Sequence, residues 1–568
     1  MTARPLPDSP RAFADATWDD IVPYYDELAA RPLDRDNADA WLRDWSALDE
    51  LLAEAQALAN IAYTTDTADP QKEAAHLRFA AEIGPRAQEQ RVRLSARLLD
   101  LGYERPDLTV PLRKFRNQRD LFREENLPLT AEVQRLNARY RKITGGMTVE
   151  WDGVEKPLPQ LAPYLLSPDR AVRERAFRLR AQPYLAARDE LADIFDRQFA
   201  LREQIARNAG FATYRDYAHQ ERNRFDYTPD DCLRFHDAVE QTVTPAVERL
   251  YGRRRLRMGL DTLRPWDTSG DPAGRPPLHP YDGTTELVGG AARIFERVDP
   301  PLGGYFQTMA GEHLLDLESR KGKAPGGYCT SLPHRRRPFI FMNASGVAGD
   351  VRTLLHESGH AFHGFESYAQ PLIWQRHPGS EMAEVASMSM ELLSAPYLER
   401  DEGGFYAPED ARRARREHLE GILTLLGHIA AVDAFQQWIY TSGEGADRDA
   451  RDAAWLRLRQ RFERGIDWSG LEAERVARWY QQLHIFLIPF YYIEYGIAQL
   501  GALQVWRNAL RDQPAAVAAY RRALALGGTR PLPDLFTAAG ARLAFDAATM
   551  GELVALVEDQ LATLERGA

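Results

Sequence analysis

Long stretches in which apolar residues recur with helical spacing, and in which few residues break a helix, dominate this sequence. They cover 37–61, 69–102, 168–207, 228–260 and about 405–568. Apolar residues that recur every three to four positions line one face of a helix. Strand signals are few and lie at 147–151, 313–317 and 338–343. The pattern therefore predicts a mainly α-helical protein with a small β component.

The clearest break in the helical pattern is 263–283, which is rich in Pro, Gly and Asp. This composition is typical of turns and loops, so we expect a long surface loop there. The chain has 568 residues, which is long enough for two to four domains.

The composition is that of a folded globular protein, with 44% hydrophobic and 27% charged residues. The formal net charge is −11. A surface that binds duplex nucleic acid needs a large cationic excess, so we expect no nucleic-acid partner. The two cysteines, Cys232 and Cys329, are too few for a disulfide framework or a thiolate-rich metal site.

No apolar run in the sequence approaches the ~18 to 20 residues of a membrane span. The nearest candidate, 479–506, contains His484, Pro489 and Glu494 and is interpreted as protein interior. The first residues carry acids and prolines where a secretory signal would be apolar. We therefore expect a cytoplasmic protein without a membrane partner.

Residues 356–360 read His-Glu-Ser-Gly-His within a predicted helix. Histidines four residues apart share one helix face, so His356 and His360 can bind the same metal ion. Glu357 lies beside them and can take a proton from a metal-bound water. Gly359 costs a helix about 1 kcal/mol relative to alanine, which is more easily tolerated where another backbone must approach closely. The spacing therefore indicates a zinc-dependent hydrolase.

A catalytic zinc site needs a third protein ligand and an open fourth position. A second predicted helix at 379–391 carries the candidates Glu381, Glu384 and Glu391. Glu384 and Glu391 are two turns, or ~10 Å, apart along that helix, so both cannot bind one zinc. Spacing alone does not separate Glu381 from Glu384. His363, one turn further along the first helix, is a rival ligand, although a helix-face histidine near the site is the more ordinary interpretation.

A third element at 484–496 carries possible hydrogen-bond donors in a largely apolar stretch. They are His484, Tyr491, Tyr492 and Tyr495. Peptide hydrolysis passes through a tetrahedral oxyanion, which donors held in a dry site stabilise. Aromatic clusters are more often core packing, so the residues alone leave both interpretations open.

Four stretches together resemble the thimet oligopeptidase family of zinc peptidases, and its oligoendopeptidase F-like branch most closely. They are PFIFMNASG, HESGHAFHG, EVASMSMELL and HIFLIPFYYIEYGIAQLGALQVW. The likeness covers roughly residues 145–510. It implies a mainly α, elongated, zincin-type peptidase with a small β-sheet near the zinc and a deep substrate channel. Residues 1–225 would form one channel wall, and 226–568 would form the zinc-binding catalytic region.

By this resemblance, one zinc per chain is bound by His356, His360 and Glu384, and Glu357 is the general base that acts on a zinc-bound water. The implied activity is endopeptidase cleavage of short unstructured peptides. Glu391 matches a family carboxylate, and we expect it to orient a ligand.

The resemblance also assigns the third element. It implies that His484 and Tyr495 stabilise the oxyanion and that Tyr492 contacts the substrate, a role that Tyr491 could take instead.

Three other functions are compatible with parts of the sequence. An exopeptidase of the same fold would use the same chemistry. A di-iron carboxylate bundle would pair the Glu357–His360 motif with a second one at Glu73–His76, but it leaves His356 and Gly359 unexplained. An inactive helical binding scaffold is disfavoured because both histidines and the base are present. The oligomeric state is left open.

Overall fold

The computed structural model describes residues 5–566, and its contacts divide the chain into two compact units. The first contains the chain up to Asp120, His279–Ala411 and Gly501–Leu543. The second contains Leu121–Leu278, Arg412–Leu500 and the chain from Ala544 onward. The boundary expected at residue 225 separates a channel wall from a catalytic region, whereas these units are defined by contacts alone. That boundary therefore stays a prediction.

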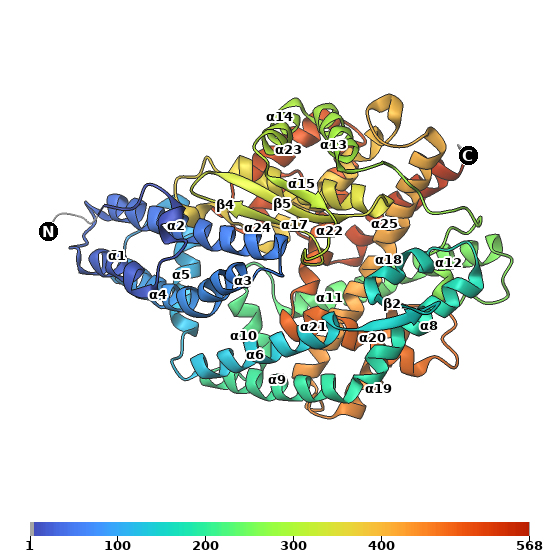
Figure 1. The fold of residues 1–568 in the computed structure, drawn as a ribbon, viewed down its shortest axis with the longest axis horizontal. Helices are drawn as coiled ribbons and strands as arrows, with labels where there is room; N and C mark the ends of the chain where they lie inside the picture. The colour runs from blue at the N-terminus through green and yellow to red at the C-terminus, as the bar shows by residue number, and fades with distance from the viewer. Residues whose placement is uncertain (1–4, 567–568) are drawn as a thin grey trace. The chain divides into compact units, whose positions relative to one another are not determined.

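The first unit combines helices with one small sheet (Figure 1). Its helices are α1 (Trp18–Ala30), α2 (Ala38–Thr65), α3 (Pro70–Leu77), α4 (Gly84–Asp100), α5 (Thr109–Leu121), α13 (Thr284–Val298), α14 (Pro300–Gly311), α15 (Ala348–Ser367), α16 (Ile373–Arg376), α17 (Ser380–Ser394), α23 (Gln513–Ala525) and α24 (Leu532–Ala538). Its strands are β3 (Leu315–Glu318), β4 (Tyr328–Leu332) and β5 (Arg337–Ala344).

The second unit is almost entirely helical. Its helices are α6 (Asn126–Gly145), α7 (Ala162–Leu165), α8 (Arg170–Ala186), α9 (Arg188–Asn208), α10 (Tyr214–Glu221), α11 (Pro229–Ala238), α12 (Thr244–Arg257), α18 (Pro408–Thr441), α19 (Arg448–Phe462), α20 (Glu472–Gln481), α21 (Leu483–Leu487), α22 (Tyr492–Ala509) and α25 (Ala547–Arg566). A hairpin joins β1 (Thr148–Trp151) to β2 (Val154–Pro157). The unit boundaries at 411 and 500 fall inside α18 and α22.

The expected mainly α fold with a little β structure is confirmed, but several predicted helices are divided. The stretch 69–102 forms α3, a π-helical segment at Arg78–Ile83 and α4, and 228–260 divides in the same way around Val239–Val243. The stretch 168–207 breaks at Ala187 into α8 and α9. Apolar spacing continues through such breaks, so periodicity alone does not show them.

The sheet of the first unit places β5 in the centre. β5 pairs in parallel with β3 and antiparallel with β4, so that Ile340 lies opposite both Leu315 and Cys329. Helix α15 packs against β4 and β5 (Figure 1). The predicted helix with the two histidines thus lies on the predicted strand 338–343.

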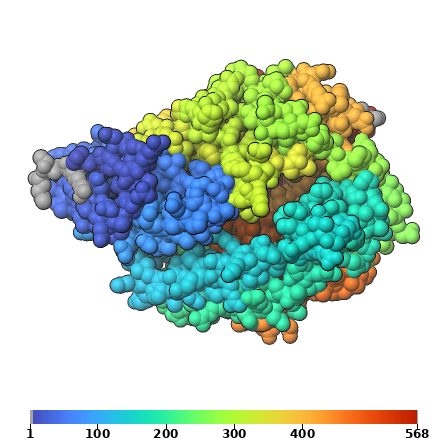
Figure 2. Space-filling view, viewed as in Figure 1, coloured from blue at the N-terminus to red at the C-terminus, as the bar shows by residue number. Residues whose placement is uncertain are grey.

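Each unit has its own hydrophobic core. In the first unit, one core is built from α1, α2, α4 and α5 around Trp41 and Trp45. Figure 2 shows these N-terminal helices in blue lying directly against the yellow segment that contains β4 and α16, which α2 contacts. In the second unit, α6, α9, α10 and α18–α20 enclose Phe435 and Trp479.

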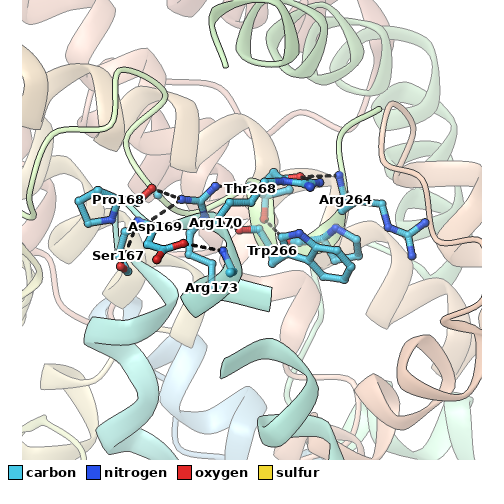
Figure 3. Close-up of polar contacts among 12 residues, drawn as sticks. Ser167, Pro168, Asp169, Arg170, Arg173, Arg264, Trp266 and Thr268 are labelled. Carbon is cyan, nitrogen blue, oxygen red and sulfur yellow. Dashed lines mark hydrogen bonds and ion pairs between the residues drawn. The ribbon is translucent and has the colours of Figure 1, made fainter. Parts of the chain in front are cut away.

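Part of the segment 263–283 is anchored in the second unit, so the surface-loop prediction is wrong there. The side chain of Asp267 is fully buried and accepts hydrogen bonds from Arg170 and Arg173 of α8. Arg173 also donates to the backbone oxygens of Trp266 and of Ser167, at 3.0 and 2.9 Å (Figure 3). These bonds neutralise the buried carboxylate and fix the segment to the start of α8.

Among the described residues, α18 is the one helix long and apolar enough to cross a membrane by length and composition. Its most apolar window has a mean hydropathy of 1.2 and is 67% buried within the protein. These values are also typical of a helix in a protein core.

Candidate metal centre

The start of α15 is held by a buried carboxylate and a buried phenol of the first unit. Asp350 accepts hydrogen bonds from the backbone N–H groups of Ser345 and Val347, at 2.8 and 3.0 Å. The Tyr281 hydroxyl donates to the same carboxylate at 2.6 Å and accepts from the N–H of Gly346 at 3.0 Å. These bonds fix the turn between β5 and α15, and they satisfy N–H groups that a helix start leaves without partners.

Gly359 is the point at which α15 meets α17. A Cβ atom on Gly359 would lie only 2.6 Å from both the Ala386 oxygen and the Ser387 Cα. No larger residue fits without moving the helices apart. The close backbone approach that the glycine indicated is therefore confirmed, and it brings the two predicted ligand helices together.

Three predicted ligands converge at this crossing. Glu384 Oε2 lies 3.4 Å from His356 Nε2 and 3.6 Å from His360 Nε2. One potential ligand atom from each residue lies within 4.8 Å of the other two. Glu384 is buried, whereas both imidazoles are half-buried. Two imidazole nitrogens and one carboxylate oxygen are the donor set of a catalytic zinc with one open position, so the residues fit that ion.

Two further groups hold these side chains in place. Glu391 Oε1 lies 2.8 Å from His356 Nδ1, which directs Nε2 of that ring towards Glu384. The Ser387 hydroxyl donates to Glu384 Oε2 at 3.0 Å. Carboxylates that orient a histidine in this manner are typical partners of metal ligands.

The predicted third element lies in the second unit. The His484 ring centroid is 4.8 Å from that of Tyr492 and 6.0 Å from that of Tyr495, and Tyr491 lies 5.1 Å from Tyr495. All four rings are half-buried, whereas the neighbouring Phe490 is buried. The structure thus brings the four predicted residues together as a partly exposed cluster.

Backbone geometry between α21 and α22 makes this cluster possible. Phe490 adopts φ +62°, which is unusual for a residue with a side chain. Its N–H donates to the Gln436 side chain at 2.8 Å, and its oxygen accepts from Arg224. These buried bonds hold the sharp turn that returns the tyrosines of α22 to His484.

A comparison with known families decides the membership of this chain. The model for "Peptidase family M3" matches residues 164–273 and 304–554. The chain belongs to peptidase family M3. The resemblance that the four sequence stretches indicated is thereby confirmed.

Individual relatives agree with this family. The chain is 26% identical over 290 residues to Oligopeptidase PepF of Bacillus subtilis, a match that spans 46% of this chain and 41% of the relative. It is 22% identical over 391 residues to an oligoendopeptidase F homologue of Mycoplasma pneumoniae, spanning 64% and 60%. These matches span less than two thirds of the relatives' own lengths. The solved structure of PZ peptidase A with an inhibitor superposes with a TM-score of 0.89 at 26% identity, covering 96% of this chain and 98% of that one.

Burial and the neighbouring carboxylates shift the pKa values of the two imidazoles in opposite directions. Burial disfavours a charged His356, but its hydrogen bonds to Glu384 and Glu391 outweigh burial and raise its pKa to about 10. Burial lowers the pKa of His360 to about 4. Burial also raises the pKa of Glu384, but the hydrogen bond from His356 and the nearby His360 prevail and lower it.

Glu357 is placed differently from the three candidate ligands. It is buried next to Cys329 of β4, and burial, together with the charge of Glu384, raises its pKa to about 7. A carboxyl group with a pKa near neutrality can both accept and release a proton.

The rival ligands lie outside the group of converging atoms. Glu381 is buried in the first turn of α17, one turn before Glu384. His363 is buried one turn beyond His360, and burial lowers its pKa to about 3. Neither belongs to the metal-ligand group found among the residues that the structure describes.

Sequence reasoning missed one residue that supports the metal-ligand group of the first unit and one that holds the aromatic cluster of the second. Tyr281 comes from the Pro-rich segment 263–283, where nothing in the pattern links it to α15. Gln482 donates to His484 Nδ1 at 2.8 Å, and its amide oxygen lies 3.1 Å from His428 Nε2. Only the position of Gln482, two residues before His484, could have indicated its role.

Proposed function

We propose that this chain is a zinc-dependent endopeptidase that hydrolyses peptide bonds in short unstructured peptides. The observation that carries the proposal is the convergence of His356, His360 and Glu384 at the crossing of α15 and α17, with Glu357 beside them. The names of the M3 relatives, an oligopeptidase and an oligoendopeptidase F homologue, support peptides as substrates.

In this proposal, His356, His360 and Glu384 hold one zinc ion. When bound, zinc polarises a carbonyl group and makes water more acidic. Glu391 keeps His356 oriented, and the Ser387 hydroxyl does the same for Glu384.

Glu357 moves the proton. It takes a proton from the attacking water and then delivers it to the nitrogen of the leaving amine. Its raised pKa supports both halves of this role, because the same group must act first as a base and then as an acid.

His484 and Tyr495 are proposed to donate hydrogen bonds to the oxyanion, and Tyr492, or Tyr491 in its place, to contact the substrate. Their partial exposure supports this assignment over simple core packing. Burial lowers the pKa of His484 to about 4, so the ring is neutral near pH 7 and donates through one nitrogen only. Since Gln482 donates to Nδ1, that nitrogen is Nε2.

The alternatives gain less support. Glu73 and His76 join no metal-ligand group among residues 5–566, so the structure offers nothing for a di-iron site. An exopeptidase would use the same residues, and only the cleavage products distinguish it from an endopeptidase. A cytoplasmic location and the lack of nucleic-acid or membrane partners stay predictions from the sequence.

The test is product mapping by mass spectrometry on a mixed peptide library, with and without a metal chelator. Internal cleavage that stops with chelator and returns with zinc is the expected result. Release of single terminal residues would instead show an exopeptidase. Cleavage that is insensitive to chelation would contradict the zinc mechanism, and a stable folded protein in the same assay should remain intact.

A further inference from the structure

A cavity of about 310 Å³ lies within the first unit, among α2, α4, α5 and α16. Small-molecule sites typically occupy roughly 300–1,000 Å³. The residues that matter for its chemistry are Gln88, Arg91, Lys114, Phe115, Gln118 and Trp374. None of them belongs to the metal centre or to the aromatic cluster of the second unit.

The charge of the cavity is positive. Its one carboxylate, Asp49, is buried and already engaged: it accepts from Arg91 Nε at 3.2 Å and from the Tyr25 hydroxyl at 3.0 Å. Because Asp49 bonds to Nε, the two Nη groups of Arg91 lie outside that pair. Lys114 is the second cation of the wall, so the cavity carries an excess positive charge in a chain of net charge −11.

Lys114 has no carboxylate within ion-pair distance among the described residues. Its ammonium donates to the backbone oxygen of His377 at 3.1 Å, which leaves two of its three N–H donors. Burial lowers the pKa of Lys114, with the more distant charge of Glu381 acting in the opposite direction. Burial also lowers the pKa of His377 to about 4, so this imidazole is neutral near pH 7.

Part of the cavity wall is aromatic. The Trp374 ring lies 4.3 Å from the ring of Trp45 and 5.4 Å from that of Phe115, measured between centroids. Trp45 is fully buried, so the aromatic wall is fixed by the core. Gln88 and Gln118 also line the cavity, and their side-chain amides are hydrogen-bonding groups.

We propose that this cavity binds an organic anion that joins one carboxylate to an aromatic or aliphatic group. The carboxylate would lie between Lys114 and the Nη groups of Arg91, and the apolar part would pack on Trp374 and Phe115. A free small acid has this chemistry, and so does the C-terminal residue of a peptide with an apolar side chain. The proposal is independent of the hydrolytic activity.

Isothermal titration calorimetry with N-acetylphenylalanine tests the proposal. The Glu357→Gln variant serves as the host protein, because its lower turnover slows peptide hydrolysis during the titration. We expect the acid to bind about tenfold or more tightly than either N-acetylphenylalaninamide, which lacks the charge, or acetate, which lacks the ring. A tetrapeptide that ends in phenylalanine distinguishes the two sources: tighter binding than the small acid indicates a peptide terminus, and equal or weaker binding indicates a free acid.

Two variants tie the binding to this cavity. Lys114→Met keeps the aliphatic chain and removes the charge, and the exposed Gln118→Glu places a carboxylate at the cavity without changing its size. Each should weaken binding of the acid about tenfold or more, whereas Lys142→Met, at an exposed lysine of α6, should not. Melting curves confirm that each variant is folded. Equal binding of acid and amide, or wild-type affinity in both cavity variants, would overturn the proposal.

Discussion

Each unit shields a carboxylate from solvent, but different groups face the two: Glu384 is buried, and Glu463 is half-buried. At the candidate metal centre of the first unit, Glu384 faces two imidazoles. In the second unit, Glu463 at the end of α19 accepts hydrogen bonds from Arg459, Arg475 and Arg478. Burial favours the neutral acid at Glu463, but the three guanidinium groups prevail and lower its pKa to about 2.

The groups around these two carboxylates differ in whether they can release a proton or bind a metal ion. A guanidinium group keeps its proton at any ordinary pH, so the charges around Glu463 are fixed. An imidazole can be protonated, neutral or bound to a metal, so the charges around Glu384 can change. Fixed cations indicate a structural role for the carboxylate that they surround, whereas imidazoles and a second carboxyl group with a raised pKa indicate a reactive site.

Of the variants that test this difference between Glu384 and Glu463, the largest expected effect is loss of zinc from the candidate metal centre. Glu384→Ala removes one of three protein ligands and should leave the protein without tightly bound zinc. Glu381→Ala, one turn earlier on α17, should keep it. Metal analysis after dialysis checks both variants. The opposite pattern would move the third ligand to Glu381.

The next effect concerns the proton rather than the metal. Glu357→Gln keeps the shape of the side chain and removes the base, so zinc should stay bound while turnover falls by ~10²–10⁴ or more. Steady-state kinetics on a fluorogenic peptide measures the change, with the exposed Glu150→Gln of β1 as the matched control. Near-normal turnover in zinc-loaded Glu357→Gln would refute the proton-transfer role.

The aromatic cluster of the second unit should show a smaller loss. Tyr495→Phe removes one donor to the oxyanion and should lower turnover by ~10²–10³, roughly 3–4 kcal/mol, with KM little changed. Tyr184→Phe, at a half-buried tyrosine of α8, is the control. Turnover within about threefold of the wild type would remove the role from Tyr495 and direct the test to Tyr492 and Tyr491.

The structural carboxylate should affect stability and not turnover. Glu463→Gln leaves three arginines without their anion and should lower the free energy of unfolding by about 3 kcal/mol. Since the folded pKa of about 2 lies below the ordinary value of 4.5, this stabilisation is fully present above about pH 4.5. It is lost as the pH falls towards 2. Urea denaturation at pH 7 and at lower pH should show the gap between wild type and variant closing, and a pH-independent gap would contradict the charge argument.

The smallest effect is expected at the start of α15. Tyr281→Phe removes the hydroxyl that donates to Asp350 and accepts from the Gly346 N–H, while Asp350 keeps its two backbone donors, so stability should fall by about 2 kcal/mol. Zinc content should not change. A melting curve and metal analysis check both statements, and loss of zinc in this variant would show that the turn also sets the ligand geometry.

Local patterns in the sequence predicted the parts of the site that one helix determines. The i, i+4 spacing of His356 and His360 needs only a helix to place both rings on one face. The choice between Glu381 and Glu384 depends on how α17 crosses α15, and that crossing is set by a contact between Gly359 and Ala386. Spacing within one helix contains no information on such a contact.

The fold shows the same limit. Helical periodicity located the helices but not the π-helical segments at Arg78–Ile83 and Val239–Val243, through which apolar spacing continues. The composition of 263–283 predicted a surface loop, yet Asp267 is buried because Arg170 and Arg173, almost a hundred residues earlier, neutralise it. Pairings over such sequence distances leave no local signal.

The contact at Gly359 has a consequence for engineering this site. Because main chain meets main chain there, the separation of the ligand helices is set by the absence of one methyl group. Changes to side chains on the outer faces of α15 and α17 would leave this main-chain contact unchanged. We therefore expect such variants to keep the same distance between the two helices and the same preferred metal ion. To fit a larger metal ion, one would instead change position 359, where one added carbon atom would push α15 and α17 apart.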